Sequence, residues 1–259
     1  MNSSVADYNL WESTVRRSLL VLAVTVFSMT AMIQPAGATH TWGNYHWART
    51  SNPFTLTLGD NMSSAWDPYL QMASDDWSAD IAGNPVNTRV AAGMTTPRKC
   101  RAVTGRIEVC NAAYGNNGWL GVANVWLSSG GHITKATTKM NDTYYNTTKY
   151  NTPTWRAAVV CQELGHTFGL DHQDESGADF HTCMDYASNP DADNMHPNTH
   201  DYEQLTMIYS HFDSTSTIGS AAASAGRSPV ADSHRAGRSK FVTRYADGSM
   251  KIRFVVWVK

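Results

Sequence analysis

Alternating apolar and polar residues predict strands in the first half of the chain. Phe54–Leu58 alternates strictly between the two kinds of residue, as a half-buried strand does. Arg106–Asn111, Trp119–Leu127 and Ile133–Met140 are three further strand candidates. We therefore expect most of the sheet between residues 54 and 140.

Two stretches carry apolar residues at helical spacing instead. The first has a core-facing stripe formed by Trp66, Tyr69, Leu70, Ala73 and Trp77. Ser63 or Ser64 is a candidate cap for this helix. The second helix, Thr154–Phe168, is entered through Pro153 and is followed by Gly169, a residue that commonly ends helices. Strands before and after helices within residues 39–213 predict an α/β or α+β domain.

The C-terminal part of the chain has a different character. Residues 214–240 are rich in Ser, Ala, Gly and Arg and show no apolar periodicity, which predicts a flexible linker. Beyond them, alternating apolar residues flank Asp247-Gly248, which predicts a β-hairpin over residues 241–259. A lone hairpin is marginal in water, so we expect this one to dock on the main domain or to pair with something else.

The N-terminal residues resemble an export signal. Arg16 and Arg17 precede an uncharged stretch, Ser18–Ile33, and Ala36-Gly37-Ala38 follows as a cleavage site. The alternative is a membrane anchor, but the apolar stretch has only about 15 residues and a span needs ~20. We therefore predict a signal peptide over residues 1–38 and a secreted protein without stable membrane insertion.

Composition and charge narrow the class of protein. The chain has 259 residues, of which 42% are apolar, enough to bury a core. Its net charge of −2 argues against a nucleic-acid partner, which a strongly basic face would indicate. Residues 39–213 carry 10 basic and 18 acidic residues, whereas residues 214–259 carry 8 basic and 2 acidic. The two regions are therefore opposite in net charge. Separately, we expect the protein to be a monomer.

Four cysteines follow the predicted signal: Cys100, Cys110, Cys161 and Cys183. An even number in an exported protein predicts two disulfides, for which three pairings are conceivable. No Cys-x-x-Cys pair is present, which disfavours a zinc ribbon.

The segment from Cys161 to His172 carries the candidate chemistry. Gln162 and His166 are four residues apart and so share one helix face, with Glu163 beside them. A sharp turn after the helix allows His172 to return to the same point. Two imidazoles and a third ligand around an open position are what catalytic zinc requires. Zinc lowers the pKa of its water towards ~7, and a nearby carboxylate can then accept the proton.

These residues resemble a known signature. Glu163-x-x-His166-x-x-Gly169-x-x-His172 is similar to the long zinc motif of the metzincin metallopeptidases. Residues 182–186 resemble the Met-turn of that family, with Met184 as its methionine. Tyr186 resembles the tyrosine that astacin-like and serralysin-like members place near the zinc, and the matrixin-like branch is another similar group. The resemblance covers roughly residues 40–212.

The resemblance implies a fold, a substrate and a set of roles. Residues 39–213 would form a metzincin-like domain: a twisted, mostly parallel sheet with an antiparallel edge strand, two long helices and a small irregular C-terminal subdomain. The Trp119–Trp126 region would be that edge strand and would pair with an extended peptide substrate. One catalytic Zn²⁺ would be held with Glu163 as general base and Tyr186 nearby. The Met-turn would lie beneath the zinc helix, which implies the disulfides Cys161–Cys183 and Cys100–Cys110.

One position departs from the family pattern. The first zinc ligand is histidine in the family, and this chain has Gln162. Gln162 could bind through its amide oxygen, Tyr186 or another histidine could replace it, or the site could be a non-catalytic relic. We therefore expect a secreted zinc-dependent endopeptidase that cleaves proteins or peptides. The alternative is a secreted binding protein that keeps the metzincin scaffold without catalysis; Glu163 favours the enzyme and Gln162 favours the binding protein.

Two further groups of residues are weaker candidates. Calcium could bind an acidic group made of Asp171, Asp174, Glu175, Asp179, Asp191 and Asp193, although solvated loop charge is the simpler interpretation. Outside the motif the histidines are scattered and are interpreted as surface or structural residues: His40, His46, His132, His181, His196, His200, His211 and His234. Among them, His181 is the candidate for a substitute zinc ligand because it stands three residues before Met184.

Overall fold

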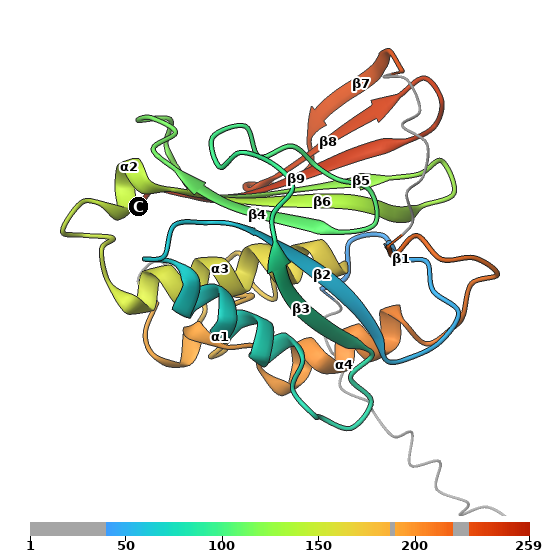
Figure 1. The fold of residues 1–259 in the computed structure, drawn as a ribbon, viewed down its shortest axis with the longest axis horizontal. Coiled ribbons are helices and arrows are strands. Elements are labelled where there is room, and N and C mark those ends of the chain that lie inside the picture. Colours follow the sequence, from blue (N-terminus) through green and yellow to red (C-terminus); the bar gives the residue numbers. More distant parts are fainter. Residues whose placement is uncertain (1–39, 187–189, 220–227) are drawn as a thin grey trace, which may run out of the picture. The chain divides into compact units, whose positions relative to one another are not determined.

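One nine-stranded sheet organises the chain, and helices cover one of its faces (Figure 1). The computed structural model describes residues 40–186, 190–219 and 228–259, so the predicted signal peptide lies outside the described residues. The strands are β1 (His46–Trp47), β2 (Phe54–Asn61), β3 (Val86–Ala92), β4 (Ile107–Ala112), β5 (Trp119–Leu127), β6 (His132–Asn141), β7 (Val230–Arg235), β8 (Lys240–Tyr245) and β9 (Met250–Trp257). The helices are α1 (Asp67–Trp77), α2 (Asp142–Tyr145), α3 (Pro153–Phe168), the short 3-10 helix η1 (Asp193–Met195) and α4 (Thr199–Ile208). The fold is therefore mixed α/β, as predicted.

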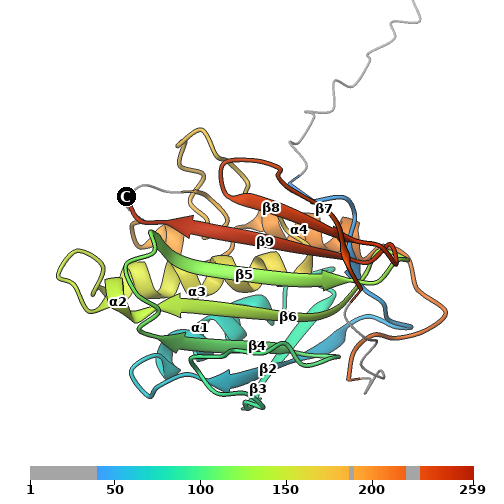
Figure 2. The same ribbon diagram turned by 90° about the horizontal axis from the view of Figure 1, so that it is seen from above.

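The sheet has a parallel part and an antiparallel part. Its order is β3-β2-β4-β6-β5-β9-β8-β7, and β1 pairs with β6 beside this path. Strands β2, β3, β4 and β6 run parallel to one another, whereas β5 runs antiparallel to β6. The expectation that β5 is an edge strand is wrong, because β9 pairs along its outer side (Figure 2). The C-terminal hairpin is thus part of the main sheet and not a separate unit.

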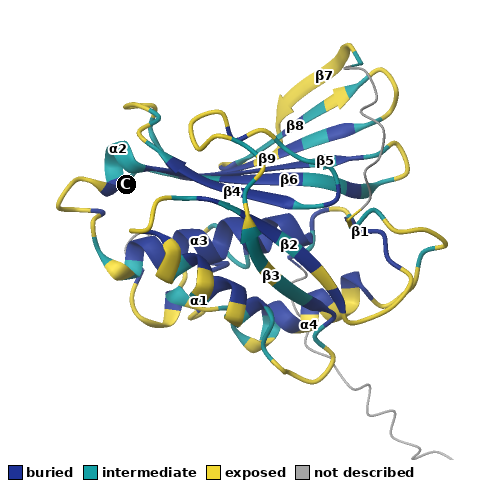
Figure 3. Ribbon diagram, viewed as in Figure 1, coloured by how far each residue is buried: buried dark blue, intermediate teal, exposed yellow. Residues whose placement is uncertain are grey.

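Helix α3 begins and ends where the sequence predicts. The Thr152 side chain accepts a hydrogen bond from the Trp155 amide, and Pro153 occupies the first turn, where its missing N–H costs nothing. Gly169 ends the helix at φ 111°, a left-handed conformation that glycine adopts without strain. Nearly every residue of α3 is buried beneath the sheet (Figure 3), so packing on all sides holds the zinc-motif helix in place.

Helix α1 begins differently from the prediction. Its N-cap is Trp66 and no side chain caps it, so neither Ser63 nor Ser64 has that role. The Trp66 ring is buried and its indole N–H donates to Asp142 Oδ1 at 3.0 Å. Tertiary packing of the tryptophan therefore sets the start of the helix in place of a local cap.

The core lies between the sheet and the helices. Its largest fully buried side chains include four aromatic rings: Trp47 of β1, Trp66 and Trp77 at the two ends of α1, and Phe168 of α3. The Trp77 indole N–H donates to the Cys161 carbonyl at 3.1 Å, which connects α1 to α3 through a satisfied polar contact. This core fixes α3 against the sheet, and the position of α3 determines where its side chains meet β5.

Two segments expected to be irregular contain regular structure. Part of the predicted linker 214–240 forms β7, whose residues are all exposed, so it has no apolar pattern to reveal it. It is held by backbone pairing with β8. The region after the Met-turn contains α4, which begins with a capping box between Asn198 and Asp201. The predicted irregular subdomain is therefore partly helical.

Both predicted disulfides are confirmed. Cys100 pairs with Cys110 across the loop before β4, and Cys161 of α3 pairs with Cys183. In the part of the chain that the structure describes, no helix is both long and apolar enough to cross a membrane.

Candidate functional site

The second and third histidines of the motif meet at one point. His166 Nε2 lies 3.1 Å from His172 Nε2, and both side chains are buried. The Gly169 turn brings His172 back beside the helix that carries His166, as the sequence predicts. Tetrahedral zinc with bonds of ~2.0–2.1 Å places two ligand nitrogens roughly 3.3–3.4 Å apart. The separation of these two nitrogens is close to that value.

The hydrogen bonds of these rings indicate which nitrogen carries the proton. His166 Nδ1 lies 2.9 Å from the Leu170 carbonyl, and His172 Nδ1 lies 3.0 Å from Glu175 Oε1. Both partners are acceptors, so each Nδ1 is the protonated nitrogen and each Nε2 presents a lone pair. Two lone pairs that face each other in a buried space repel, and a cation between them would remove this repulsion. The pair is therefore oriented as metal-bound histidines usually are.

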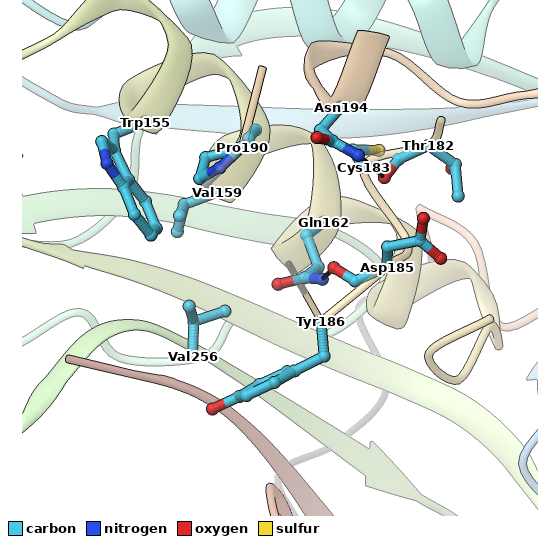
Figure 4. A pocket seen from close by; sticks show the side chains of 11 residues that line it. Trp155, Val159, Gln162, Thr182, Cys183, Asp185, Tyr186, Pro190, Asn194 and Val256 are labelled. Carbon is cyan, nitrogen blue, oxygen red and sulfur yellow. Dashed lines mark hydrogen bonds between the residues drawn. The ribbon is translucent and has the colours of Figure 1, made fainter. Parts of the chain in front are cut away.

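Gln162, the third residue of the predicted ligand set, is hydrogen-bonded to the chain after the Met-turn residue Met184. The Gln162 amide nitrogen donates to the Asp185 carbonyl at 2.6 Å, and its oxygen points away from Asp185 (Figure 4). Elsewhere in the described residues one group of three His, Cys, Asp or Glu side chains has ligand atoms within 4.8 Å of one another, and it does not include this pair. The candidates for the third position are therefore the Gln162 oxygen, the Tyr186 hydroxyl and water.

Glu163 is buried directly beside the sheet. A Cβ added at Gly121 of β5 would lie 2.5 Å from Glu163 Oε1, so only glycine leaves room for this carboxyl group. Both carboxyl oxygens are buried without a hydrogen-bond partner. Burial raises the pKa of Glu163 well above its usual range, and the nearby backbone N–H groups of Ala123 and Val256 act in the opposite direction. The group is therefore a buried carboxyl, enclosed between α3, β5 and β9.

The predicted Met-turn packs beneath α3. A Cβ at Gly165 would overlap the sulfur of Met184. The turn can therefore pack closely against α3 only because residue 165 is glycine. The Cys161–Cys183 bridge joins the same two segments covalently. Tyr186 follows, and its ring centroid lies 5.1 Å from that of His172. The structure thus brings together the predicted methionine, tyrosine and histidines.

Strand β9 covers the histidine pair. Its register places Phe254 opposite Ala123 and Val256 opposite Gly121 on β5. The Phe254 ring is fully buried and stacks on His166, with centroids 4.0 Å apart and planes inclined by 7°. The chain's own C-terminal strand therefore occupies the side of β5 where the resemblance places a peptide substrate.

Polar contacts fasten the C-terminal segment around the site. Ser239 donates to Glu175 Oε1 at 2.6 Å, and Arg238 donates to the Glu175 carbonyl at 3.1 Å. Glu175 also accepts from His172; that hydrogen bond first, and then the bond from Ser239, lower the pKa of Glu175 to about 2. Lys240 forms an ion pair with Asp171. Residues 238–240 of the basic C-terminal region are thus held against Glu175 and Asp171, two acidic residues beside the motif.

Tyr186 is also engaged by β9. Its hydroxyl oxygen accepts a hydrogen bond from the Trp257 amide at 2.9 Å. The ammonium group of Lys259 lies 3.9 Å from the centroid of its ring. Burial raises the pKa of Tyr186 to about 12, so the hydroxyl keeps its proton at neutral pH.

Other sequence candidates lie apart from the histidine pair. His181 is 64% exposed and pairs with Asp179 and Asp193, so it is not placed to replace Gln162. Asp174 accepts from the Ser176 hydroxyl and from the backbone amides of residues 177 and 178, which satisfies it within its own loop. The acidic residues considered for calcium are therefore mostly engaged by protein partners.

Sequence reasoning did not identify Phe254 or Ser239 as residues of the site. Two signals pointed towards them: the opposite charges of the two regions, and a hairpin that needs a docking surface. Neither signal states where on the domain the hairpin docks.

Comparison with known proteins adds no assignment. The chain matches no known family model, and no curated protein matches it.

Proposed function

We propose that this protein is a secreted zinc-dependent endopeptidase of the metzincin type, and that it is latent while β9 covers its cleft. The observation that supports zinc is the convergence of His166 and His172, whose lone pairs face each other at 3.1 Å. Two disulfides are compatible with export. The mixed sheet, with β5 antiparallel to β6 and α3 beneath it, is compatible with the proposed family.

The residues of the site have distinct proposed roles. Zinc, when bound, would polarise the peptide carbonyl and acidify a water molecule. His166 and His172 would hold it, with the Gln162 oxygen as the third protein ligand. Glu163 would accept the proton from the water and pass it to the leaving amine, as general acid–base catalysis requires. Tyr186 keeps a neutral hydroxyl that can donate to the carbonyl oxygen.

Latency follows from what β9 occupies. A substrate bound by β-augmentation needs the outer backbone groups of β5, and β9 uses them over Trp119–Leu127. Phe254 fills the space over His166, and the Val256 amide faces Glu163. No substrate peptide can pair with β5 in this conformation. The C-terminal strand therefore acts as a tethered competitor in the proposed enzyme.

The test of zinc binding is a comparison of two histidine variants. His172→Ala should lose the zinc of this site, because removing one of two imidazoles leaves a single nitrogen donor. His181→Ala is the matched control, since that side chain is 64% exposed and lies outside the pair. Metal analysis of the purified proteins, with circular dichroism to check the fold, measures the difference. Equal zinc contents in the two variants would exclude this pair as a zinc site.

The role of Gln162 can be tested by restoring the family residue. Gln162→His should bind zinc more tightly than the wild-type protein, because imidazole is a better zinc donor than an amide oxygen. The side chain should also release the Asp185 carbonyl, to which the amide now donates. Competition with a chelator of known affinity measures the change. An unchanged zinc affinity would mean that residue 162 is not a ligand and that Tyr186 or water completes the site.

The second candidate function is a secreted, non-catalytic binding protein. The observation in its favour is that Gln162 is already hydrogen-bonded to Asp185, while β9 fills the cleft. In that case the hairpin would be a permanent part of the sheet. The two candidates differ in one measurement, which is whether any peptide is cleaved after β9 has been displaced.

A further inference from the structure

We infer a second divalent-metal site, formed by His46, His211 and Asp213, none of which belongs to the motif at residues 161–186. The three residues come from β1 and from the chain that follows α4, so they are far apart in sequence and meet only in the fold. From the sequence, His46 and His211 are interpreted as surface or structural residues, whereas the proposed site gives them the role of metal ligands. The inference does not depend on the proposed function.

The distances between the three ligand atoms fit a metal ion. His46 Nε2 lies 3.2 Å from His211 Nε2 and 3.4 Å from Asp213 Oδ1, and His211 Nε2 lies 3.9 Å from Asp213 Oδ1. A circle through three atoms at these separations has a radius of about 2.1 Å, close to the ~2.0–2.1 Å bonds of zinc to imidazole nitrogen and carboxylate oxygen. An ion at its centre would contact all three atoms without movement of the chain.

The orientation of His46 supports the same conclusion. Its Nδ1 lies 3.0 Å from the Asn44 carbonyl, which is an acceptor, so Nδ1 carries the proton. Its Nε2 then presents a lone pair towards His211 and Asp213. This backbone contact fixes both the tautomer and the direction of the ring, as backbone carbonyls commonly do for metal-bound histidines.

A neighbouring histidine and a buried arginine position Asp213. The His132 Nε2 atom lies 3.1 Å from Asp213 Oδ1, and Arg49 contacts the other oxygen, Oδ2, at 3.2 Å. Arg49 is itself buried and donates to the Tyr209 carbonyl. The carboxylate is therefore held on both sides, with Oδ1 directed towards the two histidines. The guanidinium also offsets the carboxylate charge, so we expect weaker binding than at a site with an unpaired aspartate.

The two imidazole nitrogens and the carboxylate oxygen of this group indicate which metal ion it would bind. Two imidazoles and one carboxylate suit zinc and similar transition metals, whereas calcium prefers oxygen ligands throughout. Ligands on one face of an octahedron, about 90° apart, would lie roughly 3.0 Å from one another, and these atoms are mostly farther apart. Zinc in a three- or four-coordinate site therefore fits best, and His211 is exposed enough for the ion to enter from solvent.

Such an ion would fasten two parts of the fold. The Asp213 amide already donates to the Arg49 carbonyl, and the Thr217 amide donates to the Ala48 carbonyl. A metal bridging His46 to His211 and Asp213 would reinforce this connection between β1 and the segment after α4. The site would therefore have a structural role, and binding should raise the melting temperature, because an ion that binds only the folded chain stabilises it.

The experiment counts zinc in chains that differ at one histidine. The mature full chain is stripped with a chelator, reloaded with zinc chloride and freed of unbound metal before metal analysis. His211→Ala should lose one zinc per chain and the zinc-dependent rise in melting temperature. The substitution leaves the backbone carbonyl that accepts from Arg49 in place, so the fold should persist. His234→Ala is the matched control, since its side chain is 47% exposed, also pairs with an aspartate and lies outside the group.

The outcomes separate this inference from the proposed function. If both sites bind zinc, His172→Ala and His211→Ala each lose one equivalent, and the double variant retains none. If only the second site binds, His172→Ala keeps its zinc and His211→Ala loses it; the inference then stands and the peptidase proposal fails. If His211→Ala and His234→Ala keep equal zinc and show equal thermal shifts, the inference is overturned.

Discussion

Peptide hydrolysis should rise by at least about 100-fold once the C-terminal strand is freed from β5. The change is a recognition sequence for a site-specific protease, placed between residues 219 and 228 of the full chain. While the chain is intact, the tether presents β9 to the cleft at an effective concentration of ~1 mM, which far exceeds what a dilute peptide can reach. Cutting the tether and diluting the protein removes that advantage, and activity against a fluorogenic peptide mixture should then appear.

The release of the cut C-terminal segment should depend on salt concentration, because the segment and the domain carry opposite charges. The segment from residue 214 onward has a balance of 8 basic to 2 acidic residues, and Lys240 pairs with Asp171 on the acidic domain. Salt screens the attraction between exposed charges of the two regions and affects the partly buried Lys240–Asp171 pair less, so dissociation after cutting should be moderately faster at higher ionic strength. Released enzyme should also be less stable than intact protein, because Val122 and its apolar neighbours on β5 lose their cover.

Two controls make the release experiment decisive. A chain with an uncleavable version of the inserted sequence should stay inactive at every dilution, and excess peptide corresponding to residues 228–259 should silence the cut enzyme again. Where the cut segment remains bound, Phe254→Glu places a charge in the buried stack on His166 and should force it away. A chain shown by gel filtration to have lost the segment, yet unable to cleave any peptide with zinc present, would favour the binding-protein function.

The meeting of His166 and His172 could be predicted from the sequence because it depends on local spacing. The two histidines are six residues apart, and Gly169 ends the helix between them. The structure places their Nε2 atoms 3.1 Å apart. The disulfide pairing was also predictable, but only through the resemblance, which placed the Met-turn beneath α3.

The features that sequence reasoning missed depend on contacts between distant segments. The hairpin pattern of β8 and β9 predicted the strands but carried no information about which edge they join. The group of His46, His211 and Asp213 was missed for the same reason, since His46 and Asp213 are separated by most of the chain and no short motif joins them. Strand β7 was missed because its residues are exposed on both faces, so backbone pairing alone defines it.

The coverage of the histidine pair by β9 changes how the Gln162 departure is interpreted. A site that is exposed at all times needs an affinity high enough to keep its zinc in dilute solution. A site enclosed by β9 and Phe254 can retain a weakly held ion for longer, because the ion cannot leave until the strand moves. An amide in place of the first histidine is therefore compatible with an enzyme that is stored closed and opened once.

Glu163→Gln should abolish most of the activity of the released enzyme. Gln has nearly the shape of Glu, so it fits against Gly121, but it cannot accept a proton from water. General acid–base catalysis is typically worth ~10²–10⁴-fold, and kcat/KM should fall by about that factor. Zinc content should be unchanged, because Glu163 is not among the proposed ligands. Initial rates on a fluorogenic peptide, measured alongside metal analysis of the same samples, provide both numbers.

The matched control is Glu203→Gln on α4. The Glu203 side chain is 66% exposed and lies outside the motif. Glu203→Gln makes the same chemical change there, so the activity of this variant should stay within about two-fold of that of the released wild-type enzyme. A Glu163→Gln enzyme as active as this control would show that another group accepts the proton, and Glu163 would then be a buried structural carboxyl. Parallel loss of zinc and activity in Glu163→Gln would instead make Glu163 a ligand, which its position against β5 argues against.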